Sequence, residues 1–224
     1  MTRLLTGTAA LAVLAACVYA NSDNMLADAE PLSNPPELAG IDELDTSAGL
    51  AVIYTVSDTY SIDVEVRRGK LEDVRVERDG DTLEVGRANR NGWNWGNNLD
   101  ATVTITGPNL EGVEASSGSS AQVSGVVADE FDIDVSSGAS VTISGACTEL
   151  SVEASSGASV SAEDLVCEHG EIDGSSGASV NAYLTGTVDI DVSSGASVDV
   201  EGGARLGEGE KSSGGSYSVS PAPL

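Results

Sequence analysis

The residues of this 224-residue chain that could do chemistry are few, and their spacing argues against catalysis. His169 is the only histidine, and no Gly-x-Ser-x-Gly motif makes one of the many serines a candidate nucleophile. A polysaccharide lyase needs a base, commonly Lys or Arg beside carboxylates, but residues 112–204 contain neither. We therefore expect a protein that is not an enzyme, with a polysaccharide-active enzyme as the alternative.

Acidic side chains dominate the surface chemistry, because 36 acidic and 10 basic residues give a formal charge of −26. Such a field repels phosphate backbones, so nucleic acid is not an expected partner. Carboxylates recur at one position of the repeat described below and form a candidate cation site: Glu114, Asp134, Glu153, Asp173 and Asp191. Their oxygens suit Ca²⁺, but no Asp-x-Asp-x-Asp-Gly loop is present. We favour a solvated outer face that opposes aggregation, and expect no cofactor, with Ca²⁺ as the one candidate.

Both tryptophans lie in a Gly- and Asn-rich stretch, residues 89–98. Trp93 and Trp95, together with Arg90, form a candidate glycan-binding site, because aromatic faces flanked by polar groups suit a sugar ring. The alternative is that one tryptophan closes the N-terminal end of the folded domain.

Residues 1–20 have the pattern of an export signal, in which Arg3 precedes an apolar run too short to span a bilayer. Leu14-Ala15-Ala16-Cys17 resembles a bacterial lipobox, which would make Cys17 a lipidated first residue; Val18-Tyr19-Ala20 resembles an ordinary signal-peptidase site. The lipobox is the favoured interpretation. We expect an exported lipoprotein at the outer membrane, in the periplasm or on the cell surface, alternatively a secreted protein, with a lipid anchor as the only membrane contact.

The elements that must position these residues are strands. Residues 21–43, acidic and containing Pro31, Pro35 and Pro36, are predicted to be a linker, and residues 44–220 the folded domain. From about 48 to 106 the sequence alternates like strands without repeating, and Asp79-Gly80 predicts a hairpin turn. No window has sustained helical periodicity, so we expect an all-β fold.

An internal repeat of about 19 residues occupies 112–204 and centres on Ser-Ser-Gly-Ala-Ser. Its glycines are Gly118, Gly138, Gly157, Gly177 and Gly195. Positions five and three before the glycine, and one and three after it, are apolar or small, whereas the position four before is always acidic. This alternation predicts two short strands per repeat, odd offsets inward and even offsets outward, with the glycine at the bend between them. A coil of this length predicts a parallel β-helix, a solenoid in which each residue lies above its counterpart in the next repeat.

The cysteines give an independent test of this stacking. Cys147 lies nine residues after Gly138, and Cys167 lies ten residues after Gly157. Stacked coils would bring their Cα atoms to roughly 5 Å, which is within disulfide range, and export allows a disulfide to persist. We therefore predict a Cys147–Cys167 disulfide.

The chain resembles the adhesin head GIN domain family of secreted bacterial proteins, formerly a domain of unknown function, over roughly residues 45–220. Thr104–Val113 looks like the family's strand, Pro-x-Leu turn and entry to the first repeat; the Ser-Gly-Ala-Ser copies look like its core, and Ser213–Ser216 like its closing copy. The 89–98 stretch has no place in that pattern. The resemblance implies a right-handed parallel β-helix, similar to pectate-lyase folds, with no known catalytic centre and a role in cell adhesion.

These observations together favour a non-catalytic cell-envelope or surface protein, an adhesion module that binds a surface glycan or protein. The serine rows beside each glycine could face sugar hydroxyls, although we favour hydroxyls that hydrogen-bond along the solenoid. A purely structural envelope spacer is the remaining alternative. His169 is expected in a turn between coils.

Overall fold

The computed structural model describes residues 30–32, 35–88 and 99–221, and it is built almost entirely of β-strands. The strands are β1 (Glu30–Pro31), β2 (Glu43–Thr46), β3 (Ala51–Val56), β4 (Ser61–Arg68), β5 (Val74–Asp79), β6 (Thr82–Arg87), β7 (Asp100–Gly107), β8 (Gly112–Ala115), β9 (Ser120–Val135), β10 (Ser140–Ala154), β11 (Ser159–Gly174), β12 (Ser179–Val192), β13 (Ser197–Glu201), β14 (Arg205–Lys211) and β15 (Ser216–Val219). One 3₁₀ turn, η1 (Leu71–Asp73), interrupts the described strands.

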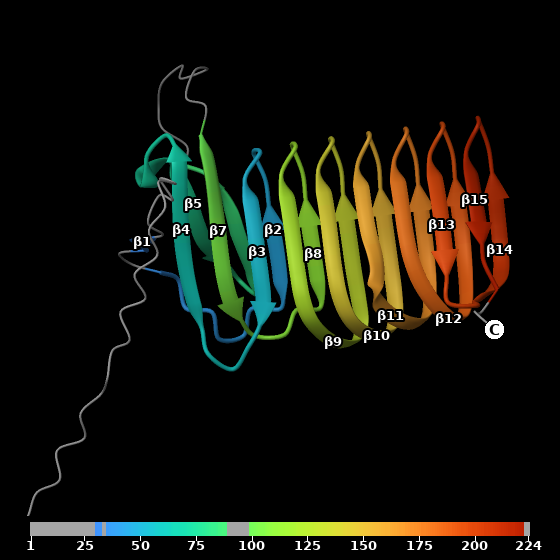
Figure 1. Cartoon of the computed structure of the whole chain (residues 1–224), viewed down its shortest axis with the longest axis horizontal. Coiled ribbons are helices and arrows are strands. Elements are labelled where there is room, and N and C mark those ends of the chain that lie inside the picture. The colour runs from blue at the N-terminus through green and yellow to red at the C-terminus, as the bar shows by residue number, and fades with distance from the viewer. Residues whose placement is uncertain (1–29, 33–34, 89–98, 222–224) are drawn as a thin grey trace, which may run out of the picture.

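Stacked parallel coils form a β-solenoid of about 5 turns, roughly 20 residues apart, which confirms the predicted fold. Figure 1 shows the coils side by side along the long axis, with β9, β10, β11 and β12 each contributing most of one coil. Each repeat is one continuous strand of 14 to 16 residues that bends around the solenoid, rather than the two short strands expected. The strand is not interrupted at the bend, because its hydrogen-bond ladder continues there through register shifts, such as the one between Ser144 and Gly145.

A tight turn closes each coil at the Ser-Ser-Gly sequence. In the second coil the backbone N–H of Ala139 donates to the carbonyl of Ser136 at 3.0 Å, and both residues between them, Ser137 and Gly138, have positive φ, at 54° and 71°. The Gly138 N–H points along the stack and donates to the carbonyl of Ser156 in the next turn, at 3.1 Å. A Cβ on Gly138 would meet nothing within 4 Å, so positive φ, and not close packing, is what requires glycine.

The solenoid begins one coil earlier than the sequence repeat indicates. Ala48 and Gly49 repeat the positive-φ turn, and β3 pairs in parallel with β9 from Ala51–Ser120 onward. Leu44 and Val52 then fall in inward rows and are buried. The segment predicted to be non-repetitive therefore contains a degenerate copy, Thr46-Ser47-Ala48-Gly49-Leu50-Ala51, whose glycine is the signal that could have revealed it.

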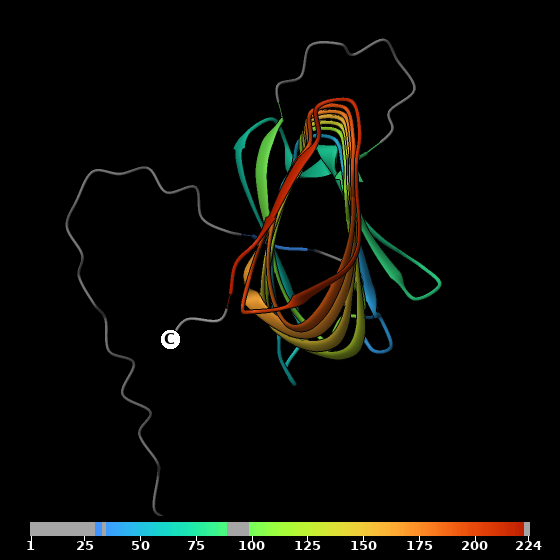
Figure 2. The same ribbon diagram turned by 90° about the vertical axis from the view of Figure 1, so that its right-hand side faces the viewer.

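The core lies inside the coils, where the inward rows stack small and branched side chains. In the five clear repeats, every residue five and three before the turn glycine, and one and three after it, is buried. In the view down the solenoid axis the coils superpose as a narrow closed outline (Figure 2). Because the interior is narrow, Ala and Val fill it, and few aromatic residues are needed; burial of each Val or Ile side chain contributes about 1.5–3 kcal/mol.

Antiparallel strands cover the N-terminal end of the stack. β4 pairs with β7 and with β1, and β5 and β6 form the predicted hairpin. Packing starts within the segment predicted to be linker, since Leu38 and Ile41 are buried and β2 begins at Glu43.

The C-terminal coil closes the opposite end with an aromatic side chain that the sequence analysis missed. Tyr217 occupies the inward row that holds Val198 in the preceding coil. Beside it the row of Ile190 ends in Gly209, which leaves room for the ring: a Cβ there would clash with the Tyr217 hydroxyl. The Lys211 ammonium lies 3.6 Å from the ring centroid, a cation–π contact over the end of the core.

The predicted disulfide is present and joins neighbouring coils. Cys147 and Cys167 are lateral partners in the β10–β11 ladder, with Cα atoms 4.6 Å apart. Cys167 is buried in the core and Cys147 is half-buried at the bend.

Candidate interaction faces of the solenoid

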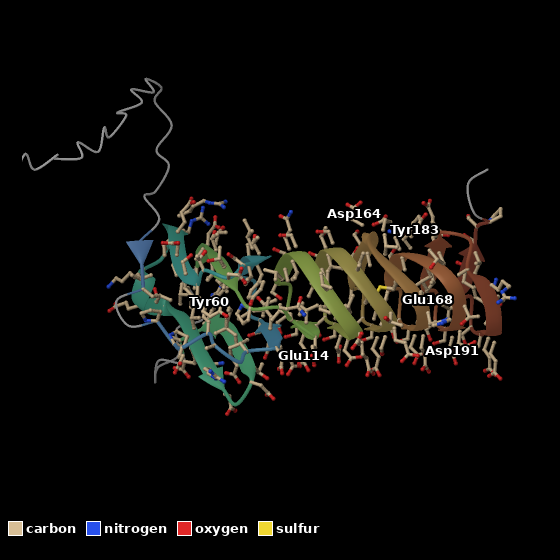
Figure 3. All side chains as sticks on the ribbon, turned by 90° about the horizontal axis from the view of Figure 1, so that it is seen from below. Tyr60, Glu114, Asp164, Glu168, Tyr183 and Asp191 are labelled. Carbon is tan, nitrogen blue, oxygen red and sulfur yellow. A yellow bond between two sulfur atoms is a disulfide. The ribbon has the colours of Figure 1, made fainter. Side chains whose placement is uncertain are left out.

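A row of carboxylates runs the length of one long face, and we call it the acidic ladder. The predicted members are lateral partners on successive coils, and the pairing adds residues at both ends. In spatial order the acidic ladder is Glu84, Asp45, Glu114, Asp134, Glu153, Asp173, Asp191 and Glu210. Figure 3 shows Glu114 and Asp191 along the same edge of the molecule. The missed members lie on β2, β6 and β14, outside the clear repeats.

Proximity and partial burial raise the pKa of three ladder carboxyls. Burial is the largest cause for Asp45, Glu114 and Asp173, and neighbouring carboxylates add to it: Glu84 for Asp45, Glu43 for Glu114 and Asp191 for Asp173. Both causes disfavour the charged form, so the pKa of each group lies above its ordinary value. The ladder therefore concentrates negative charge at a cost in electrostatic repulsion.

A groove of about 550 Å³ lies along this face, lined by Asp134, Glu153, Asp173, Asp191 and the serines of the turns. The described residues include no group of three or more His, Cys, Asp or Glu side chains close enough together to hold a metal ion. Cation binding by the ladder stays a prediction.

His169 lies in β11, in a lateral row with Glu149 and Thr187, and not in a turn as expected. The ladder continues through this part of the coil, which is why a position distant from the glycine is still strand. Its Nδ1 hydrogen-bonds with the Thr187 hydroxyl at 2.8 Å, and its Nε2 lies 3.7 Å from a Glu168 carboxylate oxygen. The histidine is thus held by its neighbours beside a carboxylate-lined groove, and no Lys or Arg accompanies it between residues 100 and 204.

The opposite long face carries mostly short, uncharged polar side chains, and Asp199 is the one charged member of its two rows. Its first row is made of serines in lateral register: Ser120, Ser140, Ser159, Ser179, Ser197 and Ser216. The next row contains Gln122, Thr142, Ser161, Asn181, Asp199 and Ser218. A hydrogen bond along the first row joins the Ser216 and Ser197 hydroxyls at 3.5 Å, and in the second row Ser218 donates to Asp199 at 2.6 Å. We call this surface the hydroxyl face.

Four of the predicted site residues lie outside the described residues. These are the lipidation candidate Cys17 and the glycan-site candidates Arg90, Trp93 and Trp95. Among the described residues, no helix is long and apolar enough to cross a membrane.

With these faces established, comparison with known proteins identifies the family. The sequence model described as "Putative auto-transporter adhesin, head GIN domain" matches residues 41–204. The chain belongs to this family. Membership in the head GIN family, together with a coil-to-coil disulfide, indicates an exported or surface protein that is non-catalytic. None of the curated proteins matches the chain.

Solved structures share the fold at low sequence identity. A "putative adhesin" from Bacteroides fragilis superposes with a TM-score of 0.61 at 14% identity, covering 82% of this chain and 94% of its own. A "putative adhesin" from Parabacteroides distasonis gives 0.53 at 14% identity, covering 86% and 96% respectively. At this identity the likeness establishes the fold of the head GIN domain alone.

Proposed function

We propose that this head GIN protein is a non-catalytic adhesion module of the cell envelope, which binds a surface glycan or protein along its long faces. The observation that carries the proposal is the lateral repetition of outward side chains. The acidic ladder and the hydroxyl face each present the same chemistry on successive coils, about 4.8 Å apart. A linear array of equivalent groups suits a repetitive or extended partner better than a single small substrate.

The same repetition argues against the enzymatic alternative. An active site requires a unique cluster in which a base, an acid or a nucleophile has its own environment. In the described solenoid the carboxylates are equivalent from coil to coil, and His169 is already bonded to Thr187. Only a binding experiment distinguishes an adhesion module from a purely structural spacer.

Beads coated with the exported protein test the adhesion function. We expect the beads to attach to immobilised envelope polysaccharide or envelope protein. Two double variants form a matched pair: Glu153→Gln/Asp173→Asn on the acidic ladder and Ser159→Ala/Ser179→Ala on the hydroxyl face. They change one row on either side of the same two turns, those of Gly157 and Gly177. Attachment lost in one variant and kept in the other would assign the face. Beads that attach to neither material would leave the spacer, and shortening of the polysaccharide would overturn the non-catalytic function.

The tryptophan stretch supplies a separate glycan hypothesis. Aromatic rings beside Arg90 suit sugar stacking, so we propose that Trp93 and Trp95 add a glycan contact. A glycan array probed with wild type and Trp93→Ala/Trp95→Ala should show weaker signals for the variant. Equal signals would remove this stretch from the binding surface.

We propose in addition that Cys17 anchors the protein by lipid, through the part of the predicted 21–43 linker that precedes β1. Labelling with palmitate should mark the wild type and not Cys17→Ser. Absence of label from the wild type would favour the secreted form, and label retained in Cys17→Ser would place the lipid on another residue and overturn the role of Cys17.

A further inference from the structure

One outward row at the wide bend of the solenoid is apolar on four successive coils and ends at Glu201 on β13. Val127, Ala146, Val166 and Tyr183 are lateral partners on β9, β10, β11 and β12. Val127 is 74% exposed and Val166 is 45% exposed, and the two residues between and beyond them are exposed and half-buried respectively. We call these four residues the apolar stripe.

The core does not need the apolar stripe. The residues just before Val127 and Val166, which are Val126 and Leu165, point inward and are fully buried, so they already fill the interior at the bend. The stripe side chains therefore project into solvent from a frame that the adjacent Cys147–Cys167 disulfide cross-links. An apolar row that contributes nothing to the core is the kind of surface that marks an interaction site.

Carboxylates border the stripe on both sides. Asp129 and Glu168 lie two residues beyond stripe members and are exposed, and Asp164 is exposed on the other side. Figure 3 looks onto this bend and labels Asp164, Tyr183 and Glu168. No Lys or Arg occurs between residues 100 and 204 to neutralise them. The surface is thus a narrow apolar line within a strongly negative field.

We propose that the apolar stripe docks a cationic amphipathic segment of a partner protein, with apolar residues on the stripe and Lys or Arg against the flanking carboxylates. The spacing fits: neighbouring stripe members are about 4.8 Å apart, close to the 5.4 Å rise of one helical turn, so an apolar helix face would follow the row. Charge selects this occupant. A second copy would bring the same carboxylates together, and an anionic lipid surface would be repelled. The proposal names a partner class for the proposed adhesion function and rests on it.

A pair of synthetic peptides tests the proposal on the full exported protein. One peptide combines Lys with Leu at helical i, i+3 and i+4 spacing, and the other has Ser in place of each Leu at equal charge. We expect the Lys/Leu peptide to bind at least tenfold more tightly by fluorescence anisotropy. Val127→Ser/Val166→Ser should weaken its binding about tenfold, because two valines then contribute no apolar burial. Ile53→Ser is the matched control, because Ile53 is an apolar residue, 39% exposed, that lies beside Gln122 on the hydroxyl face. This variant should bind the peptide as the wild type does.

Charge variants test the role of the flanking carboxylates, and sedimentation and vesicle binding test the alternative occupants. Asp129→Asn/Glu168→Gln should weaken binding at low salt and reduce its salt dependence. Equal affinity for the two peptides, or wild-type affinity in the stripe variant, overturns the proposal. Sedimentation that shows wild-type dimers lost in the stripe variant would assign the stripe to a second copy instead, and stripe-dependent binding to phosphatidylcholine vesicles would assign it to lipid. If the beads attach but the protein binds the two peptides equally, this inference fails and the adhesion function stands. If the protein prefers the Lys/Leu peptide but the beads do not attach, the adhesion function fails and the peptide site stands.

Discussion

At the scale of single residues, the backbone conformation of the turn decides which side chains are tolerated. Gly157 has a φ of 73° with open space around it, whereas Gly174 lies in an inward row at an ordinary φ. A Cβ at Gly174 would contact Ala196, Val198 and Val192 at 3.4 to 3.5 Å, which is ordinary van der Waals distance. The same substitution should therefore have opposite effects at the two positions.

We expect Gly157→Ala to lower the free energy of unfolding by about 1 kcal/mol, because alanine is strained at positive φ. Gly174→Ala should raise it by about 0.5–1 kcal/mol, because it removes backbone freedom from the unfolded chain and adds a buried methyl. Urea unfolding followed by circular dichroism measures both. Effects of the same sign would contradict this account of the turn.

Thr46 is a second residue whose environment predicts a change in stability. It is fully buried in the inward row that holds Ala115 and Val135, and its hydroxyl has no hydrogen-bond partner among the described residues. A buried hydroxyl without a partner is destabilising, and valine has nearly the same shape. Thr46→Val should raise the unfolding free energy by about 1 kcal/mol in the same urea assay, while Thr46→Ser should not; a destabilised Thr46→Val would indicate a partner for the hydroxyl.

At the scale of elements, the sequence predicts the coils well and their ends poorly. The repeat placed the inward rows, the acidic row and the cysteine pair correctly, because each depends only on offset from the turn glycine. It missed the Gly49 coil, where Leu50 and Ala51 replace Ala-Ser, and it missed Tyr217, whose role depends on the room above Gly209. The sequence repeat does not predict the apolar stripe, because register shifts at the bend break the fixed spacing from the turn glycine that relates the other rows.

The disulfide is an element-scale cross-link, and its removal should weaken the stack. It closes a loop of 20 residues, for which loop entropy predicts about 3 kcal/mol of stabilisation. Cys147→Ser/Cys167→Ala should lose about that much in urea unfolding, and reduced wild type should behave like the variant. Equal stability of oxidised and reduced protein would show that the coils do not need the cross-link.

The final coil should depend on the Tyr217 ring. Tyr217→Ala removes the aromatic cover from the end of the core, and we expect a loss of about 1–2 kcal/mol because the ring is only half-buried. Tyr217→Phe keeps the ring and its contact with the Lys211 ammonium, so its midpoint should match the wild type. Equal losses in the two variants would assign the effect to the hydroxyl and not to the ring.

At the scale of the whole molecule, charge is distributed unevenly along the axis. The described Lys and Arg residues lie in the N-terminal part of the domain and on β14, whereas residues 100–204 contain many Asp and Glu residues and no Lys or Arg. Neighbouring carboxylates of the acidic ladder are about 4.8 Å apart, and each pair repels by roughly 1 kcal/mol in water. The solenoid thus keeps this surface strongly negative at some cost in stability.

This charge distribution makes stability dependent on pH in a defined direction. The pKa values of Asp45, Glu114 and Asp173 are raised in the folded protein, so between the ordinary values of 3.8 and 4.5 and the raised values the folded state binds more protons than the unfolded chain. The contribution of these groups is fully present below the ordinary values and is lost as the pH rises through the raised ones. Because of the acidic ladder, we therefore expect the thermal unfolding midpoint of the protein to be higher near pH 5 than at pH 7. Added NaCl should raise the midpoint at pH 7 by screening.

Neutralising part of the ladder should mimic both effects. Glu153→Gln/Asp173→Asn should melt at a higher temperature than wild type at pH 7 and show a smaller change between pH 7 and pH 5, whereas Glu163→Gln, an exposed carboxylate outside the ladder, should leave the pH dependence unchanged. A wild-type midpoint that falls from pH 7 to pH 5 would mean that carboxylates stabilised by partners outweigh the repelled ones.

Thermal unfolding with CaCl₂ and with chelator, at constant ionic strength, tests whether the acidic ladder binds Ca²⁺. A rise with Ca²⁺ that disappears in the ladder variant would make the row a divalent-ion site, and an unchanged midpoint would leave it a solvated face whose charge acts on partners.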